Sequence, residues 1–422
     1  MDIQTINDNI RQISIEFARE RRDRQIRRHL EPADFQRLRD AGFLLANTPA
    51  EYGGAWRDPQ RSTRSVSEML RVLAQGDPSV ALVASMHPAV LLFAGWQMLE
   101  QAPEPYTRPW EEQRRWVFET AVDGHWWGTI ISEPGSAGSL HNTRSTARPE
   151  EPPFGYRVTG QKHFGSGSGM TSYMVTSAIA GDDSELDLFI LDLRDVPWDG
   201  SAGITLVGAW DGHGMSATQS HALRFDDFPA TRAAWPVHRE REKKSLRVRP
   251  VACLYAAVFV GIVEIALDTA RQQLERRRES LGSFEQVEWT RAEMEGWLVQ
   301  QAYQGMLREV EQQTGNSPFF GKTAIAELSA SVLDRLCKIL GGGTFARHSP
   351  FGFWLQDVRA LGFLRPPWGL AFDTMQEAIP HQPTSEIGQG LTERPQSDAG
   401  TGSEPADRTA AMAASHSGQG PS

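Results

Sequence analysis

The sequence predicts an α+β fold in which two helical regions flank a central β region. Apolar residues first recur every three or four positions, then gather in short strand-like runs, and then return to the helical period. The final stretch has almost no large apolar residues. The predicted domains are an N-terminal helical domain (1–125), a β domain (126–236), a C-terminal helical domain (237–380) and a disordered tail (381–422).

The first two regions differ in the spacing of their apolar residues. Helical spacing is present in "FQRLRDAGFLL" and "SVSEMLRVLAQ". The β region contains runs rich in aromatic and β-branched residues, and clusters of Gly, Pro, Asn and Asp separate them. These runs are "WWGTII", "YRVTGQKHF", "SYMVTSAI", "LDLFILDL" and "HALRFDDF".

The C-terminal region returns to long amphipathic patterns, such as "VEIALDTARQQLERRRESL" and "AIAELSASVLDRLCKIL". An apolar segment that begins at Val251 is interrupted by Glu264 and Asp268, so we interpret it as a buried core helix rather than a membrane span. The tail that follows cannot bury enough apolar surface to offset the entropy of ordering, which predicts disorder.

Composition narrows the class of protein. The chain has 422 residues and a net charge of -10, which argues against nucleic acid or an anionic membrane as the main partner. Its two cysteines lie in apolar surroundings without CxxC spacing, and the charged N-terminus lacks the apolar core of a signal peptide. We therefore expect a cytoplasmic protein. No P-loop, GxSxG or HExxH motif occurs, so no metal site is expected.

Four patches in a fixed order carry a resemblance to a known family. They are "GDPSVALVASMH", "SEPGSAGSLHNTRSTA", "VTGQKHFGSGSG" and "KILGGGTFARHSPFGFWLQDVRA". Together they resemble the acyl-CoA dehydrogenase superfamily over roughly 35–374, a group that includes flavin dehydrogenases and reduced-flavin monooxygenases. The resemblance implies a central β-barrel or sandwich and a C-terminal four-helix bundle. It also implies a flavin: FAD, or reduced FMN or FAD supplied by a reductase.

The resemblance assigns flavin contacts to four residues of the β region. In the family, the position matching Ser132 hydrogen-bonds the flavin ring, and the serine matching Ser139 meets the pyrophosphate, although "GSAGS" departs from the usual "GAGSD". Phe164 matches an aromatic residue beside the ring and Ser166 a hydroxyl that faces N5. The alternative for "KHFGSGSG" is a flexible loop between strands. We interpret His163 as strand surface.

The glycine run at 341–343 has two interpretations. In the family, the glycines matching Gly341 and Gly342 lie where a neighbouring subunit's FAD passes close to the backbone. This implies a cofactor site shared between chains and a homotetramer, or at least a dimer. The alternative is a tight turn that ends a helix.

The catalytic base of the dehydrogenases has no counterpart at either of its usual positions. The family alignment places the catalytic glutamate at Arg365, and the relocated base of other members at Val251 or a close neighbour. A guanidinium cannot remove an α-proton, and dehydrogenation requires a carboxylate near the α-carbon. Arg365 binds a carboxylate or phosphate of the substrate, or else is a surface arginine before the Pro366-Pro367 break.

The missing base favours the monooxygenase branch, which needs reduced flavin and dioxygen but no glutamate. Many of its members carry a histidine in the segment matching "SMHPAV", where His87 stands. The alternative for His87 is packing inside the N-terminal helices. A second histidine, common in the segment matching "ALGFLRPPW", is absent here. We predict catalytic roles for His87 and Ser166, and substrate contacts from His87 and Arg365.

The sequence thus predicts a flavin-dependent oxidoreductase, and more specifically a monooxygenase acting on a small organic substrate. Two alternatives stay open: an acyl-CoA dehydrogenase with an unrecognised base, and a flavin-binding homologue without catalysis. A flavin reductase or an electron acceptor protein would serve as partner.

Overall fold

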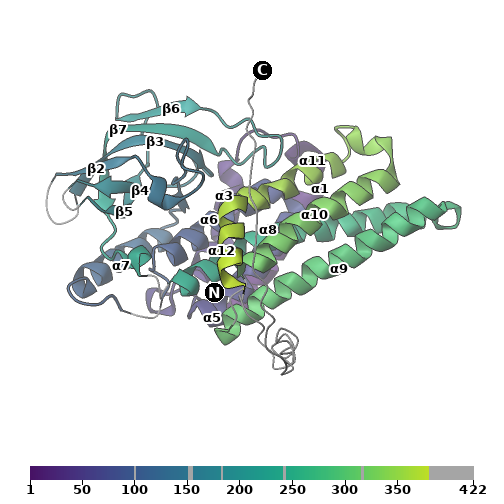
Figure 1. The fold of residues 1–422 in the computed structure, drawn as a ribbon, viewed down its shortest axis with the longest axis horizontal. Coiled ribbons are helices and arrows are strands. Elements are labelled where there is room, and N and C mark those ends of the chain that lie inside the picture. Colours follow the sequence, from purple (N-terminus) through teal and green to yellow (C-terminus); the bar gives the residue numbers. More distant parts are fainter. Residues whose placement is uncertain (99–100, 151–154, 182–183, 241–243, 315–317, 380–422) are drawn as a thin grey trace, which may run out of the picture. The chain divides into compact units, whose positions relative to one another are not determined.

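A computed structural model describes residues 1–98, 101–150, 155–181, 184–240, 244–314 and 318–379 of the protein. The predicted disordered tail, 381–422, lies outside the described residues. Met1–Ala378 form one compact unit, whose ribbon is drawn in Figure 1.

Helices form the first part of this unit, and aspartate caps explain where two of them begin. Asp58 accepts a hydrogen bond from the Arg61 backbone N–H at 2.7 Å, and Asp77 accepts one from Val80 at 3.0 Å. A proline follows each cap, at the first helical position, where its fixed φ suits the helix. The helices are α1 (Ile3–Arg19), α2 (Arg21–Arg24), α3 (Pro32–Asp40), α4 (Phe43–Ala46), α5 (Pro59–Gly76), α6 (Pro78–Phe93) and α7 (Thr107–Val122).

The strands that follow close into a barrel. β4 pairs with both β2 and β5, β7 pairs with both β3 and β5, and β2 pairs with β3, so the ladder returns to its starting strand. β1 extends the sheet from β4, and β6 pairs with β7. The strands are β1 (Trp127–Thr129), β2 (Thr146–Pro149), β3 (Gly155–Gly165), β4 (Tyr173–Ala180), β5 (Leu186–Asp192), β6 (Ile204–Gly208) and β7 (His221–Arg232).

Alternating strand residues fill the barrel. Val158, Met174, Phe189 and Phe225 are buried in one apolar cluster, as the period of two in β structure requires. A second cluster joins Val90 of α6 to aromatic residues of β1 and β4, which fixes the barrel on the N-terminal helices.

The C-terminal helices pack around α8. Its stretch Arg247–Glu275 is long and apolar enough to cross a membrane by length and composition, but 83% of its most apolar window is buried inside the fold. Helices α5, α6, α9 and α10 all pack against it, and Figure 1 shows α8, α9 and α10 running alongside one another. The helices are α8 (Lys244–Glu275), α9 (Ser283–Gln312), α10 (Pro318–Leu340), α11 (Phe351–Val358) and α12 (Trp368–Ala378). The predicted α+β fold is confirmed.

Candidate flavin site

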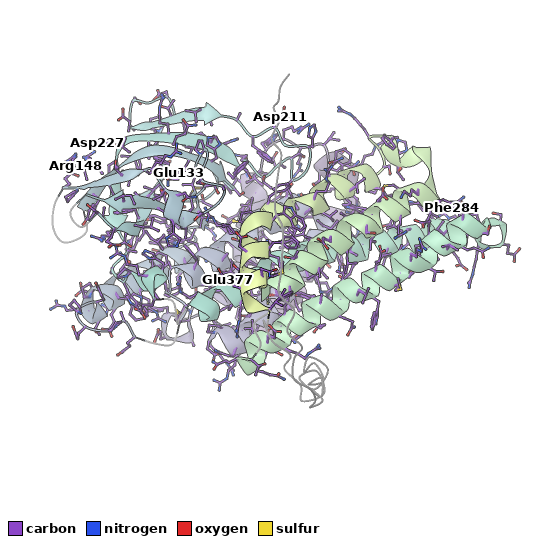
Figure 2. All side chains as sticks on the ribbon, in the orientation of Figure 1. Glu133, Arg148, Asp211, Asp227, Phe284 and Glu377 are labelled. Carbon is purple, nitrogen blue, oxygen red and sulfur yellow. The ribbon has the colours of Figure 1, made fainter. Side chains whose placement is uncertain are left out.

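The loop that follows β1 is held in place by a buried carboxylate. Glu133 accepts hydrogen bonds from the Thr143 hydroxyl, from the Arg144 N–H at 2.7 Å and from the Ser145 hydroxyl at 2.9 Å. It also pairs with Lys162 of β3, whose Nζ lies 2.5 Å from Oε1. Figure 2 places Glu133 among the strands. These bonds tie both ends of the Ser132–Ser145 loop to the barrel.

The Glu133–Lys162 pair is fully charged at neutral pH. Burial raises the pKa of Glu133, but the hydrogen bonds from Lys162 and Thr143 outweigh it and lower the value to about 2. Burial lowers the pKa of Lys162 to about 8, although Glu133 opposes this shift. Lys162 has no exposed surface, and its Nζ also donates to the Ser177 carbonyl oxygen at 2.5 Å.

Phe164 stands at the end of β3 in a strained conformation. Its φ is +59°, a left-handed value that an aromatic residue rarely adopts, and its side chain is 60% exposed. The Trp210 ring lies 6.2 Å from the Phe164 ring, and the Trp210 indole is fixed by a 2.9 Å hydrogen bond to the Met215 carbonyl oxygen. Strain and exposure together indicate an aromatic surface kept for a ligand.

Two serines frame this aromatic surface. The Ser132 carbonyl oxygen accepts a 2.7 Å hydrogen bond from the His163 N–H, which places Ser132 beside Phe164. The Ser166 N–H donates to the Phe164 carbonyl oxygen at 3.0 Å. The Ser166 hydroxyl is buried and shares a 2.8 Å hydrogen bond with the Ser220 hydroxyl.

His87 lies inside the protein on α6. Its Nδ1 accepts a 3.1 Å hydrogen bond from the Trp127 N–H, so the proton of the neutral ring is on Nε2. Nε2 is buried and has no hydrogen-bond partner among the described residues. Complete burial lowers the pKa of His87 to about 3, so the ring is neutral at pH 7. The result is one unpaired N–H donor, a costly arrangement that calls for a functional explanation.

Arg365 contacts the loop that follows β1. Its Nη1 donates to the Gly138 carbonyl oxygen at 2.6 Å, and its Nη2 lies 3.4 Å from the Ser132 Oγ. Gly138 has a φ of +77°, and a Cβ there would lie 2.6 Å from Pro367, so only glycine permits this close approach. Arg365 is half-buried rather than a free surface arginine, and burial lowers its pKa.

The structure therefore brings most of the predicted residues together and leaves two apart. Contacts link Ser132, Phe164, Ser166 and Arg365, and Ser139 follows Gly138 directly. Val83, one turn before His87, would touch a Cβ at Gly167, so α6 underlies the same loop. The glycines at 341 and 342 have open space where a Cβ would project and no contact with this group among the described residues.

Three further residues belong to this neighbourhood and were not predicted. Trp210 adds the second aromatic ring, and Lys322 of α10 donates to the Leu364 and Pro366 carbonyl oxygens at 2.7 and 2.8 Å. Tyr255 of α8 is buried, with its hydroxyl 3.8 Å from the Met86 sulfur. Burial raises the pKa of Tyr255 to about 12, although Arg365 lowers it. Tyr255 lies one turn after Val251, a spacing that could have indicated a shared helix face.

The group fits a flavin. An exposed, strained aromatic residue with a second aromatic beside it suits the face of a flat ring. The hydroxyls of Ser132 and Ser166 suit its polar edge, and Arg365, which forms no ion pair with any described residue, lies beside Ser132. No carboxylate of the described residues hydrogen-bonds or pairs with Ser132, Ser166, His87 or Arg365.

Comparison with known proteins gives relatives that are similar in sequence. Amino sugar nitrososynthase DnmZ of Streptomyces peucetius is 26% identical over 361 residues, which is 79% of this chain and 82% of the relative. A dibenzothiophene monooxygenase of Rhodococcus erythropolis is 26% identical and covers 57% of this chain and 55% of its own length. Putative acyl-CoA dehydrogenase YdbM of Bacillus subtilis is 24% identical over 84% of this chain and 89% of its own. No family model matches the chain.

Solved structures share the fold. KijD3 in complex with FMN and dTDP-3-amino-2,3,6-trideoxy-4-keto-3-methyl-D-glucose has a TM-score of 0.68, with 21% identity, 93% of this chain and 95% of the other covered. Butyryl-CoA dehydrogenase from Megasphaera elsdenii has a TM-score of 0.72 and is 16% identical. The match covers 88% of this chain and 97% of the other. From the fold, the relatives and the residues of the site, the protein is a flavin-dependent oxidoreductase of the acyl-CoA dehydrogenase superfamily.

Proposed function

We propose that the protein is a monooxygenase that uses reduced flavin and dioxygen to oxygenate a small organic substrate. The observation that carries the proposal is the contact of Arg365 with Ser132, because the family resemblance matches Arg365 to the base of the dehydrogenases. The resemblance matches the other usual base position to Val251 or a close neighbour on α8, and Tyr255 follows Val251 one turn later. A phenol whose pKa is about 12 is a poor base at neutral pH.

The flavin would supply the reaction with dioxygen, and the chain would bind and shield it. Phe164 and Trp210 would cover the ring, Ser132 and Ser166 would hydrogen-bond its polar atoms, and Ser139 would meet its phosphate end. The Ser166 hydroxyl can donate only one proton at a time. The Thr218 hydroxyl donates to the Met215 carbonyl oxygen, so Ser220 donates to Thr218 and Ser166 donates to Ser220. Ser166 would therefore accept a hydrogen bond from the N5–H of a reduced flavin.

His87 would act as a neutral hydrogen-bond donor. With Nδ1 occupied by Trp127, the Nε2–H is the only donor that the ring offers, and its low pKa keeps it neutral through the physiological range. A neutral donor can hold an oxygen atom of the substrate or of the reacting dioxygen without carrying a charge into an apolar site. Arg365 would bind an anionic group of the substrate with the N–H groups not used by Gly138 and Ser132.

The names of the relatives suggest the substrate class. One relative is named for an amino sugar and another for dibenzothiophene, so nitrogen or sulfur is the atom that we propose is oxygenated. A KijD3 structure contains a dTDP-linked amino sugar, whose diphosphate is the kind of anion that an arginine binds. We propose an organic amine or sulfide with an anionic group.

A homotetramer is proposed as the assembly, in the cytoplasm, with a separate reductase supplying the flavin. The support is an exposed apolar face of α9, because apolar residues grouped on one face mark an interaction surface more often than single scattered ones do. Figure 2 labels Phe284, at the start of this helix. The α9 face consists of Phe284, Val287, Met294, Trp297 and Leu298. The open space at Gly341 and Gly342 supports a cofactor shared with a neighbouring subunit.

Titration with FAD and FMN, each oxidised and reduced, tests the proposal. We expect tighter binding of a reduced flavin, because a monooxygenase of this kind receives its flavin reduced. Retention of oxidised FAD through purification would instead support the acyl-CoA dehydrogenase alternative. Failure to bind any of the four forms would overturn the assignment of a flavin site and leave a homologue without catalysis.

A further inference from the structure

The positive charge of Arg365 has no acidic partner within the part of the chain that the structure describes. Its guanidinium donates to a carbonyl and a hydroxyl, and among the described residues it forms no ion pair with Asp or Glu. The neighbouring Lys162 does not change this balance, because Glu133 already neutralises it. Partly buried charges are normally paired or bound to a ligand. This uncompensated cation therefore calls for an anion from outside the chain.

A buried lysine holds the backbone of the segment that carries Arg365. Lys322, whose side chain is only 2% exposed, donates to the carbonyl oxygens on both sides of Arg365, those of Leu364 and Pro366. Pro367 packs against Gly138, where a Cβ would not fit. The guanidinium is thus held by its backbone as well as by its own hydrogen bonds. A charged group that is already held in place can stabilise an opposite charge with little reorganisation.

Arg365 also determines how Ser132 presents its hydroxyl. Because the guanidinium has donors only, Ser132 Oγ must be the acceptor in their 3.4 Å contact. The Ser132 proton then points elsewhere and is available to a ligand. A cation and a hydroxyl donor are therefore in contact, and the exposed Phe164 follows His163, whose N–H donates to the Ser132 carbonyl oxygen.

We propose that Arg365 selects the redox state of the flavin: its charge stabilises the reduced, anionic form and leaves the neutral oxidised form unaffected. The proposal rests on the flavin site proposed above. Reduced flavin carries a negative charge at neutral pH, whereas oxidised flavin carries none on its ring, so a fixed cation one hydroxyl away distinguishes them. Lys322 is the positioning residue that holds Arg365 in place. The site would thereby retain flavin that arrives reduced and release it after oxidation.

Dissociation constants of oxidised and reduced flavin, measured without substrate, test this proposal. Because no substrate is present, any contact between Arg365 and the substrate cannot affect the result. In Arg365→Gln we expect the preference for reduced flavin to fall at least tenfold, about 1.4 kcal/mol. The midpoint potential of the bound flavin should fall by about 30 mV for each tenfold change in a two-electron couple. Arg365→Lys retains the charge and should keep the preference within about threefold.

Arg144 supplies the matched control. It is an exposed arginine near Gly135 of the same loop, so Arg144→Gln makes the same charge change on the solvent side and should leave the preference unchanged. A wild type that binds no flavin would overturn the proposed function. A wild type that prefers reduced flavin, together with an Arg365→Gln variant that keeps this preference, would overturn only the role of Arg365. Loss of the preference in Arg365→Lys would also overturn it, because charge could not be the cause.

Discussion

Replacing Lys162 with Met should destabilise the protein and loosen the loop that carries the proposed flavin contacts. The substitution leaves the Glu133 carboxylate buried without its cation, since the Glu133 side chain is only 5% exposed. Breaking a buried pair from one side costs about 3–5 kcal/mol. The bonds from Thr143, Arg144 and Ser145 remain, so we expect a loss near the lower end, about 3 kcal/mol.

The lowered pKa of Glu133 makes this contribution to stability depend on pH. Its folded value of about 2 lies below the ordinary 4.5, so its contribution to stability is complete above pH 4.5 and is lost as pH falls toward 2. In Lys162→Met the pKa of Glu133 should rise toward its ordinary value, so acid unfolding should begin at a higher pH.

Urea unfolding of four proteins at pH 7 measures the effect: the wild type, Lys162→Met, Glu133→Gln and the double variant. The double variant leaves no unpaired charge, so it should be more stable than Lys162→Met alone, with a coupling of about 2 kcal/mol or more. Flavin affinity should fall in both single variants, because Glu133 holds the loop of Ser132 and Ser139. Additive losses, or a Lys162→Met variant as stable as the wild type, would refute this reasoning.

Four further predictions test other parts of the structure. Phe164→Gly should relieve the left-handed strain and stabilise the fold by about 1 kcal/mol in thermal unfolding. It should also weaken flavin binding at least tenfold, and unchanged binding would contradict the proposed contact of Phe164 with the flavin ring. His87→Ala should lower turnover more than flavin affinity, and an equal loss of both would indicate a packing role. Burial raises the pKa of Asp357 to about 7 from an ordinary 3.8, so the free energy of unfolding should fall as pH rises from about 4 to 7. Asp357→Asn should remove this dependence on pH, which urea unfolding across that range would measure. Trp297→Glu on the α9 face should produce smaller assemblies in light scattering, whereas an unchanged mass would place the subunit interface elsewhere.

Sequence patterns predicted the fold well where apolar spacing was regular, and missed elements where it was not. The long runs of β3, β4, β5 and β7 were all predicted: β3 and β7 alternate between buried and exposed residues, whereas β4 and β5 are short runs of mostly buried residues. β2 has only four residues, "TARP", and β6 only five, "ITLVG", so neither gives enough alternation to detect. Both strands form because they pair with β3 and β7, and not because their own residues favour a strand.

The site was predicted only where the family motifs reach. The grouping of Ser132, Phe164 and Ser166 followed from ordered patches, but nothing local indicates that Phe164 adopts a left-handed conformation. Lys162 was missed because lysine is normally exposed, and its burial depends on Glu133, 29 residues earlier. The clamp of Lys322 on residues 364 and 366 is a tertiary contact between distant segments, which no single-sequence pattern encodes.

The central claim is that this flavoprotein lacks the base for dehydrogenation and oxygenates its substrate instead. The most direct test adds acyl-CoA thioesters of several chain lengths, without oxygen, to the protein loaded with oxidised FAD. With Arg365 at the proposed base position, and with no carboxylate in contact with Ser132 or Ser166 in the described part of the chain, we predict that the visible absorption of the flavin does not bleach. Rapid bleaching by any thioester would contradict the account, because a group outside the two usual positions would then be removing the α-proton.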